Sequence, residues 1–590
     1  MHVNEGHQQA PYALPGAWDG NPALKSLMKR TLSNETFAAV SQDCEGFQER
    51  LAGPIHDLRL KVEEPSLVQF NQWGQRVDTL KTSEGWRGLK QVAAEEGLVA
   101  LPYERKQGSS SRTYAFVKSY LWLPECGYVG CPIAMTDGCA RVLELAGTTE
   151  MKQEILPLLT SRVAGKAWTA GQWMTEKPGG SDVSLTETVA TPVTFSPEPK
   201  PGDSFVLNGF KWFSSATDGN VALALARTGG EGSRGLSLFA VKMRKEDGTT
   251  NGIFIHRLKR KFGTKAVPTA ELSLEGCIGQ LVGQPGEGVR IISSVLNITR
   301  LHSAVTSVAS LRRALDIASG FARVRHVGGK DGSLLSHNEM HTSVLASSEL
   351  VHRALLQVVF GTIGLLGKSE AEPLKFTEEE GHRLRLLTPV VKSFAADLAS
   401  REMMKCMEAL GGQGYMEENE FGRLIADQSV ERIWEGTTNV LALDVVRVIL
   451  KSKGASVKAF IDWATAVLTS TPAELNLAVP RQIITTDLAL LGKATKSYFQ
   501  PTPADPRLAR PLLYLIGFAA SSVHLAEQAI WSHGKQGEDA EVNRAAVERW
   551  SDNGGVREAR RTIEELLRRG EDVRERETKL DASLVYGSKL

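Results

Sequence analysis

Apolar residues change their spacing along the chain, and these changes divide the sequence into five regions. Residues 1–60 are interrupted by Pro and Gly and only weakly periodic, which predicts an irregular N-terminal arm with one short helix near 21–33. Residues 61–173 predict a helical domain, since Leu67, Phe70, Trp73 and Leu80 recur at nearly helical intervals. From 174 to 283 the period becomes two, in short runs separated by Gly, Asp and Asn, and this pattern predicts a β-domain.

Beyond residue 283 the helical spacing returns. One apolar stripe that includes Ile298 and Ala322 predicts a helix of more than thirty residues starting near Glu287. Further helices are expected at about 343–367, 383–410 and 438–450, so residues 284–450 are predicted to form a four-helix bundle. Residues 451–590 are predicted to add a polar helical region. The predicted fold class is multidomain α+β: an N-terminal helical bundle, a central β-barrel or sandwich, and a C-terminal helical bundle with extra helices.

Composition and charge narrow the possible functions. The 590 residues include 69 basic and 68 acidic side chains, and this balance excludes a global basic field for nucleic acid. Six cysteines without a Cys-x-x-Cys pair give neither a disulfide framework nor a zinc ribbon, which favours a reducing compartment. No run of 18 apolar residues occurs, so we expect no membrane span, and the polar start predicts no secretory signal.

The chain ends in Ser588, Lys589 and Leu590, the tripeptide that the peroxisomal import receptor reads. This ending predicts a peroxisomal protein that binds that receptor. The alternative is that a frayed polar tail ends in these residues by accident.

Three segments carry groups suited to chemistry. The turn Met-Thr-Glu-Lys-Pro-Gly-Gly-Ser-Asp (174–182) offers hydroxyls and open amides to a heteroaromatic edge and a pyrophosphate, although it also suits a plain interdomain loop. In Lys-Trp-Phe-Ser-Ser (211–215) the indole can form the wall of a flat-ring site, although Trp in a strand more often belongs to the core. In Glu-Arg-Ile-Trp-Glu-Gly-Thr-Thr-Asn (431–439) the carboxylate of Glu435 lies on a tight loop beside apolar residues, as a general base requires.

Two other patterns predict no ligand site. His337 and His341 have the spacing of metal ligands on one helix face, but Glu339 is out of place for the zinc-protease motif, so we predict a helical surface and no metal. The glycines at 283, 286 and 288 lack the spacing and the βαβ context of a dinucleotide fingerprint, and they predict a turn into the long helix.

Taken together, the motifs resemble the flavin-dependent acyl-CoA dehydrogenases, and among them the AidB-like branch, over about residues 60–450. The resemblance rests on Met-Thr-Glu-Lys-x-Gly-Gly-Ser-Asp-Val (174–183), Lys-Trp-Phe (211–213), Leu-Gly-Gly-x-Gly-Tyr (410–415) and Ile-Trp-Glu-Gly (433–436), in the family's order and spacing. The extra C-terminal helical region is also typical of that branch. The resemblance implies an oxidoreductase of fatty acid metabolism, a flavoprotein that binds FAD and acts on an acyl-CoA substrate.

The resemblance also assigns residues. It implies that Glu435 is the general base and that Arg300 faces it across the active site. It implies that Arg325 reaches the FAD pyrophosphate of a neighbouring subunit in a homotetramer. The remaining residues that it assigns to the FAD site are Gln172, Met174, Thr175, Gly180, Ser181, Trp212, Ser214, Gly411, Gly412, Thr437 and Asn439.

One segment departs from the family. After Arg325 the family reads His-Val-Phe-Gly, whereas this chain has Gly328 and Gly329 followed by an insertion at 330–335. The missing aromatic residue predicts that FAD is held more loosely, or that another side chain stacks on its adenine.

Two functions remain open from the sequence. The leading prediction is FAD-dependent oxidation of an acyl-CoA at Cα–Cβ: a carboxylate removes the α-proton while the β-hydride passes to the flavin. In a peroxisome the electron acceptor is expected to be O2, as in an oxidase. The alternative is an AidB-like flavoprotein that binds or protects nucleic acid with little dehydrogenation, and the near-neutral charge makes that partner unlikely.

Overall fold

The computed structural model describes residues 2, 5, 8–328, 332–502, 504–535 and 538–587. The chain forms two compact units. The first consists of Met1–Ser348 and Ala399–Glu435, and the second of Glu349–Leu398 and Gly436–Leu590. Helices α11 (Glu339–Ala371) and α12 (Glu378–Glu408) each contribute residues to both units.

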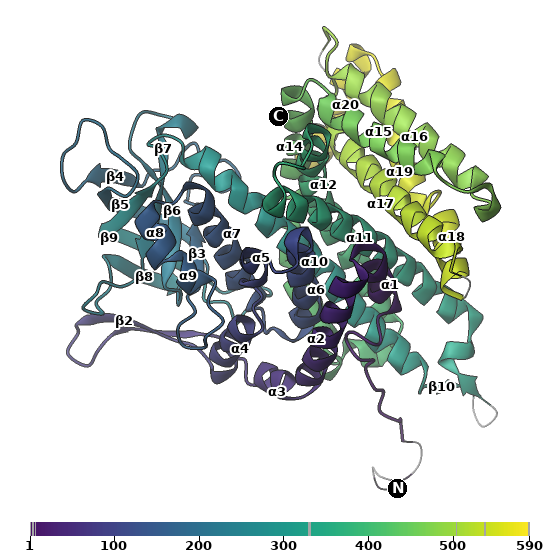
Figure 1. The fold of residues 1–590 in the computed structure, drawn as a ribbon, viewed down its shortest axis with the longest axis horizontal. Helices are drawn as coiled ribbons and strands as arrows, with labels where there is room; N and C mark the ends of the chain where they lie inside the picture. The colour runs from purple at the N-terminus through teal and green to yellow at the C-terminus, as the bar shows by residue number, and fades with distance from the viewer. Residues whose placement is uncertain are drawn as a thin grey trace. The chain divides into compact units, whose positions relative to one another are not determined.

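A seven-stranded mixed sheet forms the β-domain of the first unit (Figure 1). Its strands are β3 (Ala170–Trp173), β4 (Val189–Pro192), β5 (Ser204–Ser214), β6 (Val221–Arg227), β7 (Leu236–Lys242), β8 (Ile253–Leu258) and β9 (Ala270–Val282). The order β3-β6-β4-β5-β9-β7 is completed by pairing of β7 with β6, so five strands close on themselves as a small barrel. The predicted fold class, with helical regions before and after a β-domain, is confirmed.

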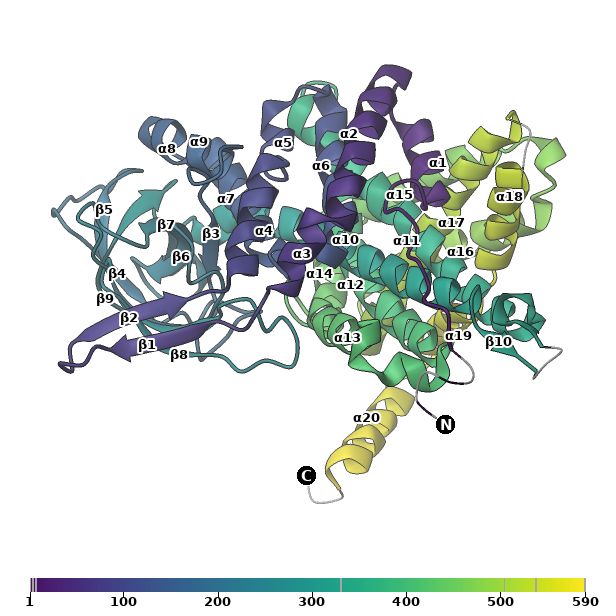
Figure 2. The ribbon, with the colours of Figure 1, turned by 90° about the horizontal axis from the view of Figure 1, so that it is seen from below.

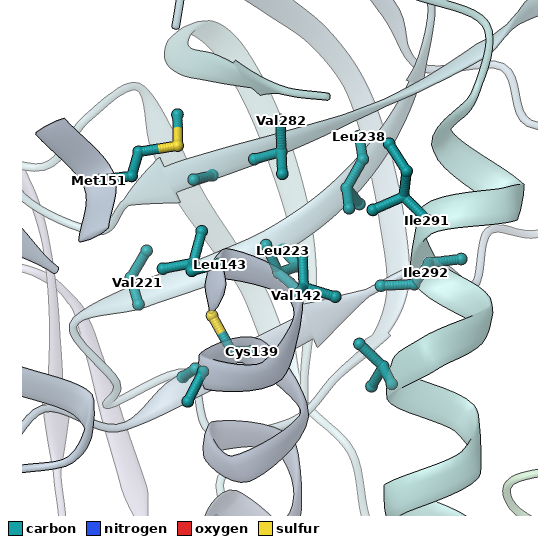
Figure 3. Close-up of a cluster of buried hydrophobic side chains, with 14 of the residues drawn as sticks. Cys139, Val142, Leu143, Met151, Val221, Leu223, Leu238, Val282, Ile291 and Ile292 are labelled. Atoms are coloured by element: carbon teal, nitrogen blue, oxygen red, sulfur yellow. The ribbon is translucent and has the colours of Figure 1, made fainter. Parts of the chain in front are cut away.

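Strand β6 separates two apolar layers because successive side chains point to opposite faces of a sheet. Ala222, Ala224 and Ala226 belong to the cluster inside the barrel, with Phe205 and other apolar residues. Val221, Leu223 and Leu225 belong to an outer cluster with residues of α7 (Gly130–Ala146) and of α10 (Gly288–Ala322) (Figure 3). The sheet is therefore fixed to α7 and to α10, and α10 carries Thr299 and Arg300 of the candidate site.

Helix α10 starts directly on the sheet. A Cβ at Gly288 would lie 2.6 Å from the carbonyl carbon of Ser237 in β7, so only glycine allows the first helical turn to approach this closely. The other helices of the first unit are α1 (Pro22–Thr31), α2 (Asn34–Ala52), α3 (Pro54–Leu60), α4 (Glu84–Glu95), α5 (Leu101–Glu104), α6 (Ser111–Trp122), α8 (Thr149–Glu154), α9 (Leu156–Leu159) and α13 (Phe421–Ser429).

The prediction of an irregular arm is wrong for residues 34–60, which form α2 and α3. Ser33 caps α2, since its Oγ accepts a hydrogen bond from the Thr36 amide at 3.1 Å. Val40, Cys44, Phe47 and Leu51 are buried at helical spacing. Gly53 and Pro54, which suggested irregular chain, mark the boundary between two helices.

The helical prediction is wrong for residues 66–81, which form a hairpin of β1 (Ser66–Phe70) and β2 (Arg76–Lys81). Leu67 pairs with Leu80 across the hairpin, and Trp73 is 78% exposed in its turn. The Asn71 side chain accepts hydrogen bonds from the amides of Trp73 and Gln75, each at 3.0 Å. The hairpin lies along β8 (Figure 2), so its apolar spacing reflects strand pairing rather than a helix.

The second unit is helical. Beside its parts of α11 and α12 it contains α14 (Thr438–Lys451), α15 (Ala455–Thr469), α16 (Ala478–Ser497), α17 (Ala509–His533), α18 (Glu538–Trp550), α19 (Gly554–Arg568) and α20 (Glu571–Tyr586). The prediction of helices at 451–590 is confirmed, but the region is not uniformly polar. Helix α17 is apolar and mostly buried, and α14, α15, α16, α18 and α19 contact it.

Two helical segments are long and apolar enough to cross a membrane, Glu339–Ala371 and Pro506–His533. Within the described residues, 67% and 83% of their most apolar stretches are buried against protein. Core helices of soluble proteins show the same properties, so these segments are weak indications of a membrane span.

Candidate active site

Glu435 lies in the turn that follows α13 and a short 3-10 helix, Val430–Arg432, of the first unit. Its backbone has φ of 56°, a left-handed conformation that non-glycine residues adopt rarely and often at functional sites. The half-buried carboxylate accepts a hydrogen bond from the Thr299 hydroxyl of α10, with 2.7 Å between Oγ1 and Oε2. The α10 helix therefore fixes the direction of the carboxylate.

Arg300, which the resemblance places opposite the base, donates from Nε to the backbone carbonyl oxygen of Glu435 at 3.4 Å. It is 8% exposed. Sequence reasoning singled out Arg300 and missed Thr299, the residue whose hydroxyl holds the carboxylate. The two residues are adjacent on α10, and the sequence gives no sign of which side chain reaches which atom of Glu435.

The loop after β3 and the strand β5 are joined by a buried ion pair. Lys211 Nζ lies 2.6 Å from Glu176 Oε1, and both side chains are almost completely buried. Glu176 also accepts hydrogen bonds from the Thr188 hydroxyl at 2.5 Å and from the Glu187 amide at 2.6 Å. Burial lowers the pKa of Lys211, and Glu176 opposes that effect.

This ion pair aligns the two cofactor motifs. The amide of Trp212 donates to the carbonyl oxygen of Thr175 at 3.0 Å, so the loop and the strand run side by side. The Glu and Lys of the two motifs are therefore structural. Sequence reasoning missed this role because the partners are 35 residues apart.

Two buried polar atoms at this end of the sheet suit a bound heteroaromatic ring. Gln172 Oε1 and Ser214 Oγ have no hydrogen-bond partner within the described residues. A buried polar atom without a partner is costly, and a ligand edge with complementary donors and acceptors removes that cost. The residues therefore fit the FAD that the sequence predicts.

Other residues of the two motifs shape the space around Thr175 and Trp212. A Cβ at Gly180 would lie 3.0 Å from Thr175 Oγ1, so glycine keeps the space beside this hydroxyl open. Lys259 Nζ lies 3.2 Å from the centre of a ring of Trp212 and covers one face of the indole. Ser181 is exposed, while Met174 packs against the apolar cluster that also holds the start of α10.

Arg325 and the glycines of the 410–415 motif lie elsewhere in the first unit. Arg325 Nη1 donates to Gln9 Oε1 at 3.2 Å, so the N-terminal segment contacts the end of α10. Gly411, at φ of 60°, and Gly412 are exposed in a 3-10 turn. Gly328 follows a two-residue strand, His326–Val327, whereas Gly329 and Lys330 lie outside the described residues.

Thr437 and Asn439 belong to the second unit. Thr437 is the N-cap residue of α14, and Asn439 Oδ1 accepts a hydrogen bond from Arg510 Nη1 at 3.2 Å. Within the first unit, the structure brings Gln172, Met174, Thr175 and Gly180 together with Trp212 and Ser214 at the sheet, and it brings Arg300 to Glu435.

The histidine pattern at 337–341 does not lie on one helix. His337 ends a 3-10 turn and His341 lies in the first turn of α11. Within the described part of the chain, no group of three or more His, Cys, Asp or Glu residues could hold a metal ion. All six cysteines are free thiols and buried.

Three family models match the chain. Residues 8–163 match the N-terminal domain of the adaptive response protein AidB, residues 171–277 the acyl-CoA dehydrogenase middle domain, and residues 286–450 the acyl-CoA dehydrogenase C-terminal domain.

Named relatives agree with these matches. The chain is 38% identical over 555 residues to acyl-CoA dehydrogenase family member 11 of Caenorhabditis elegans, covering 91% of this chain and 88% of the relative. It is 32% identical over 402 residues to the putative acyl-CoA dehydrogenase AidB of Escherichia coli, covering 67% and 70%. The crystal structure of Caenorhabditis elegans ACDH-11 in complex with C11-CoA superposes with a TM-score of 0.89 at 36% identity, covering 100% of this chain and 98% of that one.

Proposed function

Because this chain belongs to the acyl-CoA dehydrogenase family, in its AidB-like branch, we propose that it oxidises the Cα–Cβ bond of an acyl-CoA thioester to the 2-enoyl-CoA. The observation that carries this proposal is the carboxylate of Glu435, which is half-buried in a left-handed turn and held by Thr299. The cofactor of the family is FAD, which supplies a hydride acceptor when bound.

The residues of the chain have separate tasks in this proposal. Glu435 accepts the α-proton of the thioester, and Thr299 keeps the carboxylate in one orientation. Gln172 and Ser214 bind the polar edge of the cofactor through the atoms that lack partners within the described residues. The Glu176–Lys211 pair holds the loop that carries Thr175 against β5, so the site is preorganised.

The purified protein is expected to contain about one non-covalent FAD per chain and to lose its flavin absorbance under nitrogen when a cognate acyl-CoA is added. The worm relative binds C11-CoA, so the panel of acyl-CoAs should run from short to long chains and include that length. Absorbance spectra measure both properties. A correctly folded protein that takes up no FAD, or a flavin that no acyl-CoA bleaches, would contradict the proposal.

The proposed cellular location is the peroxisome. It is supported by Ser588, Lys589 and Leu590 at the end of the sequence, which lie outside the described residues, and by the exposure of α20, whose residues are all exposed or half-buried. In that compartment O2 is the proposed electron acceptor.

Deleting residues 588–590 should move a fluorescently tagged protein from peroxisomes to the cytosol without changing its FAD content, because the tripeptide is a receptor-read address. The tag is placed at the N-terminus, and fluorescence microscopy with a peroxisomal marker records the result. An unchanged peroxisomal pattern after deletion would show that the ending is accidental.

The proposed assembly is a homotetramer in which Arg325 serves the FAD of a neighbouring subunit, as the family resemblance implies. Analytical ultracentrifugation of the FAD-loaded protein should give the mass of four chains. Replacing Arg325 with Met should lower the FAD content without a change of fold. A flavin-loaded monomer would contradict this assembly.

A further inference from the structure

A second carboxylate, Glu431, lies four residues before Glu435 and is completely buried. It accepts three hydrogen bonds, from the Tyr128 hydroxyl at 2.6 Å, the Ser303 hydroxyl at 2.6 Å and Trp434 Nε1 at 2.7 Å. These donors come from three parts of the chain: the segment before α7, the helix α10, and the residue directly before the base. Glu431 therefore joins α7 and α10 to the turn that carries Glu435.

The hydrogen-bond pattern indicates the charge state of Glu431. A deprotonated carboxylate can only accept hydrogen bonds, whereas a protonated one carries an O–H group that needs an acceptor. Hydroxyl and indole groups that donate to the two oxygens favour the deprotonated, negatively charged form. Tyr128 is affected by the same surroundings. Burial, and then the charge of Glu431, raises the pKa of the Tyr128 hydroxyl well above its usual value.

Glu431 and Glu435 are both held by α10. Thr299 and Ser303, which are one turn apart on α10, each hold one of the two carboxylates. The charges of both carboxylates also affect the pKa of the Cys131 thiol in α7. Its pKa is raised first by burial and then by Glu431, and Glu435 adds to the rise.

We propose that Glu431 is a positioning residue for the base. Its carboxylate fixes the indole directly before Glu435 and ties this turn to Tyr128 and to Ser303 of α10. A turn that is held from three sides keeps the carboxylate of Glu435 in one place, and a general base must be positioned within reach of the proton it takes. This inference rests on the proposed function, since it assigns a role only if Glu435 acts as the base.

Other charged groups also lie around Glu431 and Glu435. Arg300 donates to the backbone of Glu435, and Lys261 opposes the two carboxylates at the thiol of Cys131. Burial lowers the pKa of Lys261. The backbone oxygen of Asp427 lies 3.2 Å from the Tyr128 hydroxyl, and burial raises the pKa of the Asp427 side chain. Glu431 is thus one of several charged groups around the turn of Glu435.

Replacing Glu431 with Gln removes the charge while nearly preserving the volume. The rate of flavin reduction at saturating acyl-CoA should fall by roughly threefold, because the amide cannot accept from all three donors as the carboxylate does and holds the turn of Glu435 less firmly. A purely structural role would change FAD content and thermal stability but would leave the rate per bound FAD unchanged.

The experiment compares the FAD-loaded parent with E431Q, W434F and E402Q by rapid mixing under nitrogen from pH 5 to 9. Trp434→Phe removes one donor and keeps the carboxylate, so its rate should fall as well. Glu402 is the matched control, another buried carboxylate that accepts from a serine, Ser348, at 2.7 Å, and E402Q should behave as the parent.

A rate per bound FAD in E431Q that equals the rate of an active parent would overturn this inference and leave the proposed function intact. A parent that no acyl-CoA reduces would overturn both. If E431Q does not fold, E431D provides the test, because it keeps the charge but cannot reach all three donors. An E431D protein with the rate of the parent would then contradict the positioning role.

Discussion

Replacing Glu435 with Gln is expected to slow flavin reduction by a cognate acyl-CoA at least about a hundredfold, which is the usual contribution of a general base. The amide keeps the shape of the side chain and still accepts a hydrogen bond from Thr299, but it cannot take the α-proton. FAD content and acyl-CoA affinity should change little. Rapid mixing under nitrogen, with absorbance of the flavin as the signal, measures the rate.

Thr299→Val is the companion variant. It leaves the carboxylate in place and removes only the hydroxyl that orients it, so the loss of rate should be smaller than in E435Q. An E435Q protein that binds FAD and is reduced within a few-fold of the parent rate would exclude Glu435 as the base. Glu435 would then serve to anchor the turn against α10.

The largest expected loss of stability follows from changing Asp137, a fully buried residue of α7. Its carboxylate accepts from Arg112 Nη1 at 2.6 Å and from the Tyr103 hydroxyl at 2.8 Å, and His302 Nε2 lies 2.9 Å away. These partners lie on α6, α5 and α10. Asp137→Asn leaves the guanidinium of Arg112 buried without this carboxylate, and such a break costs about 3–5 kcal/mol of unfolding free energy. Urea denaturation of the FAD-loaded protein measures this loss.

The same carboxylate gives the stability a defined pH dependence. Burial alone would raise the pKa of Asp137, but Arg112 and His302 together hold it well below its usual range. The stabilisation is therefore present above the unfolded pKa of about 3.9 and is lost as the pH falls toward the lower folded pKa. Between these values the parent should lose stability with acid more steeply than Asp137→Asn.

Glu84→Gln is the control for charge removal, because the pair of Glu84 with Lys61 is solvent-exposed. Exposed pairs contribute little, so the midpoint of its urea transition should remain close to that of the parent. A midpoint of Asp137→Asn that is also unchanged would mean that the buried pair does not stabilise the first unit.

The sequence predicted the β-domain and the long helices because their signals are local. Strand β6 is apolar at every position but the last and is bounded by turns, and the stripe of α10 continues for 35 residues. The hairpin at 66–81 was missed because residues three apart, Leu67 and Phe70, imitate a helix. Only the cross-strand pairing of Leu67 with Leu80 shows the register.

Most residues of the candidate site were predicted from the sequence, but the contacts between them were not. Its motifs located Glu435, Thr175 and Trp212 through resemblance to a family. The contacts that organise them are long-range and have no local pattern. Thr299 meets a residue 136 positions away, and Glu431 meets Tyr128 over 303 positions. Such pairs depend on how α7 and α10 pack, which the spacing of apolar residues does not specify.

The most direct measurement of the central claim is a single turnover under nitrogen with product analysis. The FAD-loaded protein is mixed with less than one equivalent of the acyl-CoA that bleaches it best, and the thioester is then identified by mass spectrometry. The account predicts one 2-enoyl-CoA, lighter than the substrate by two hydrogens, for each FAD reduced. Unchanged acyl-CoA with oxidised flavin, or bleaching without enoyl-CoA, would contradict it.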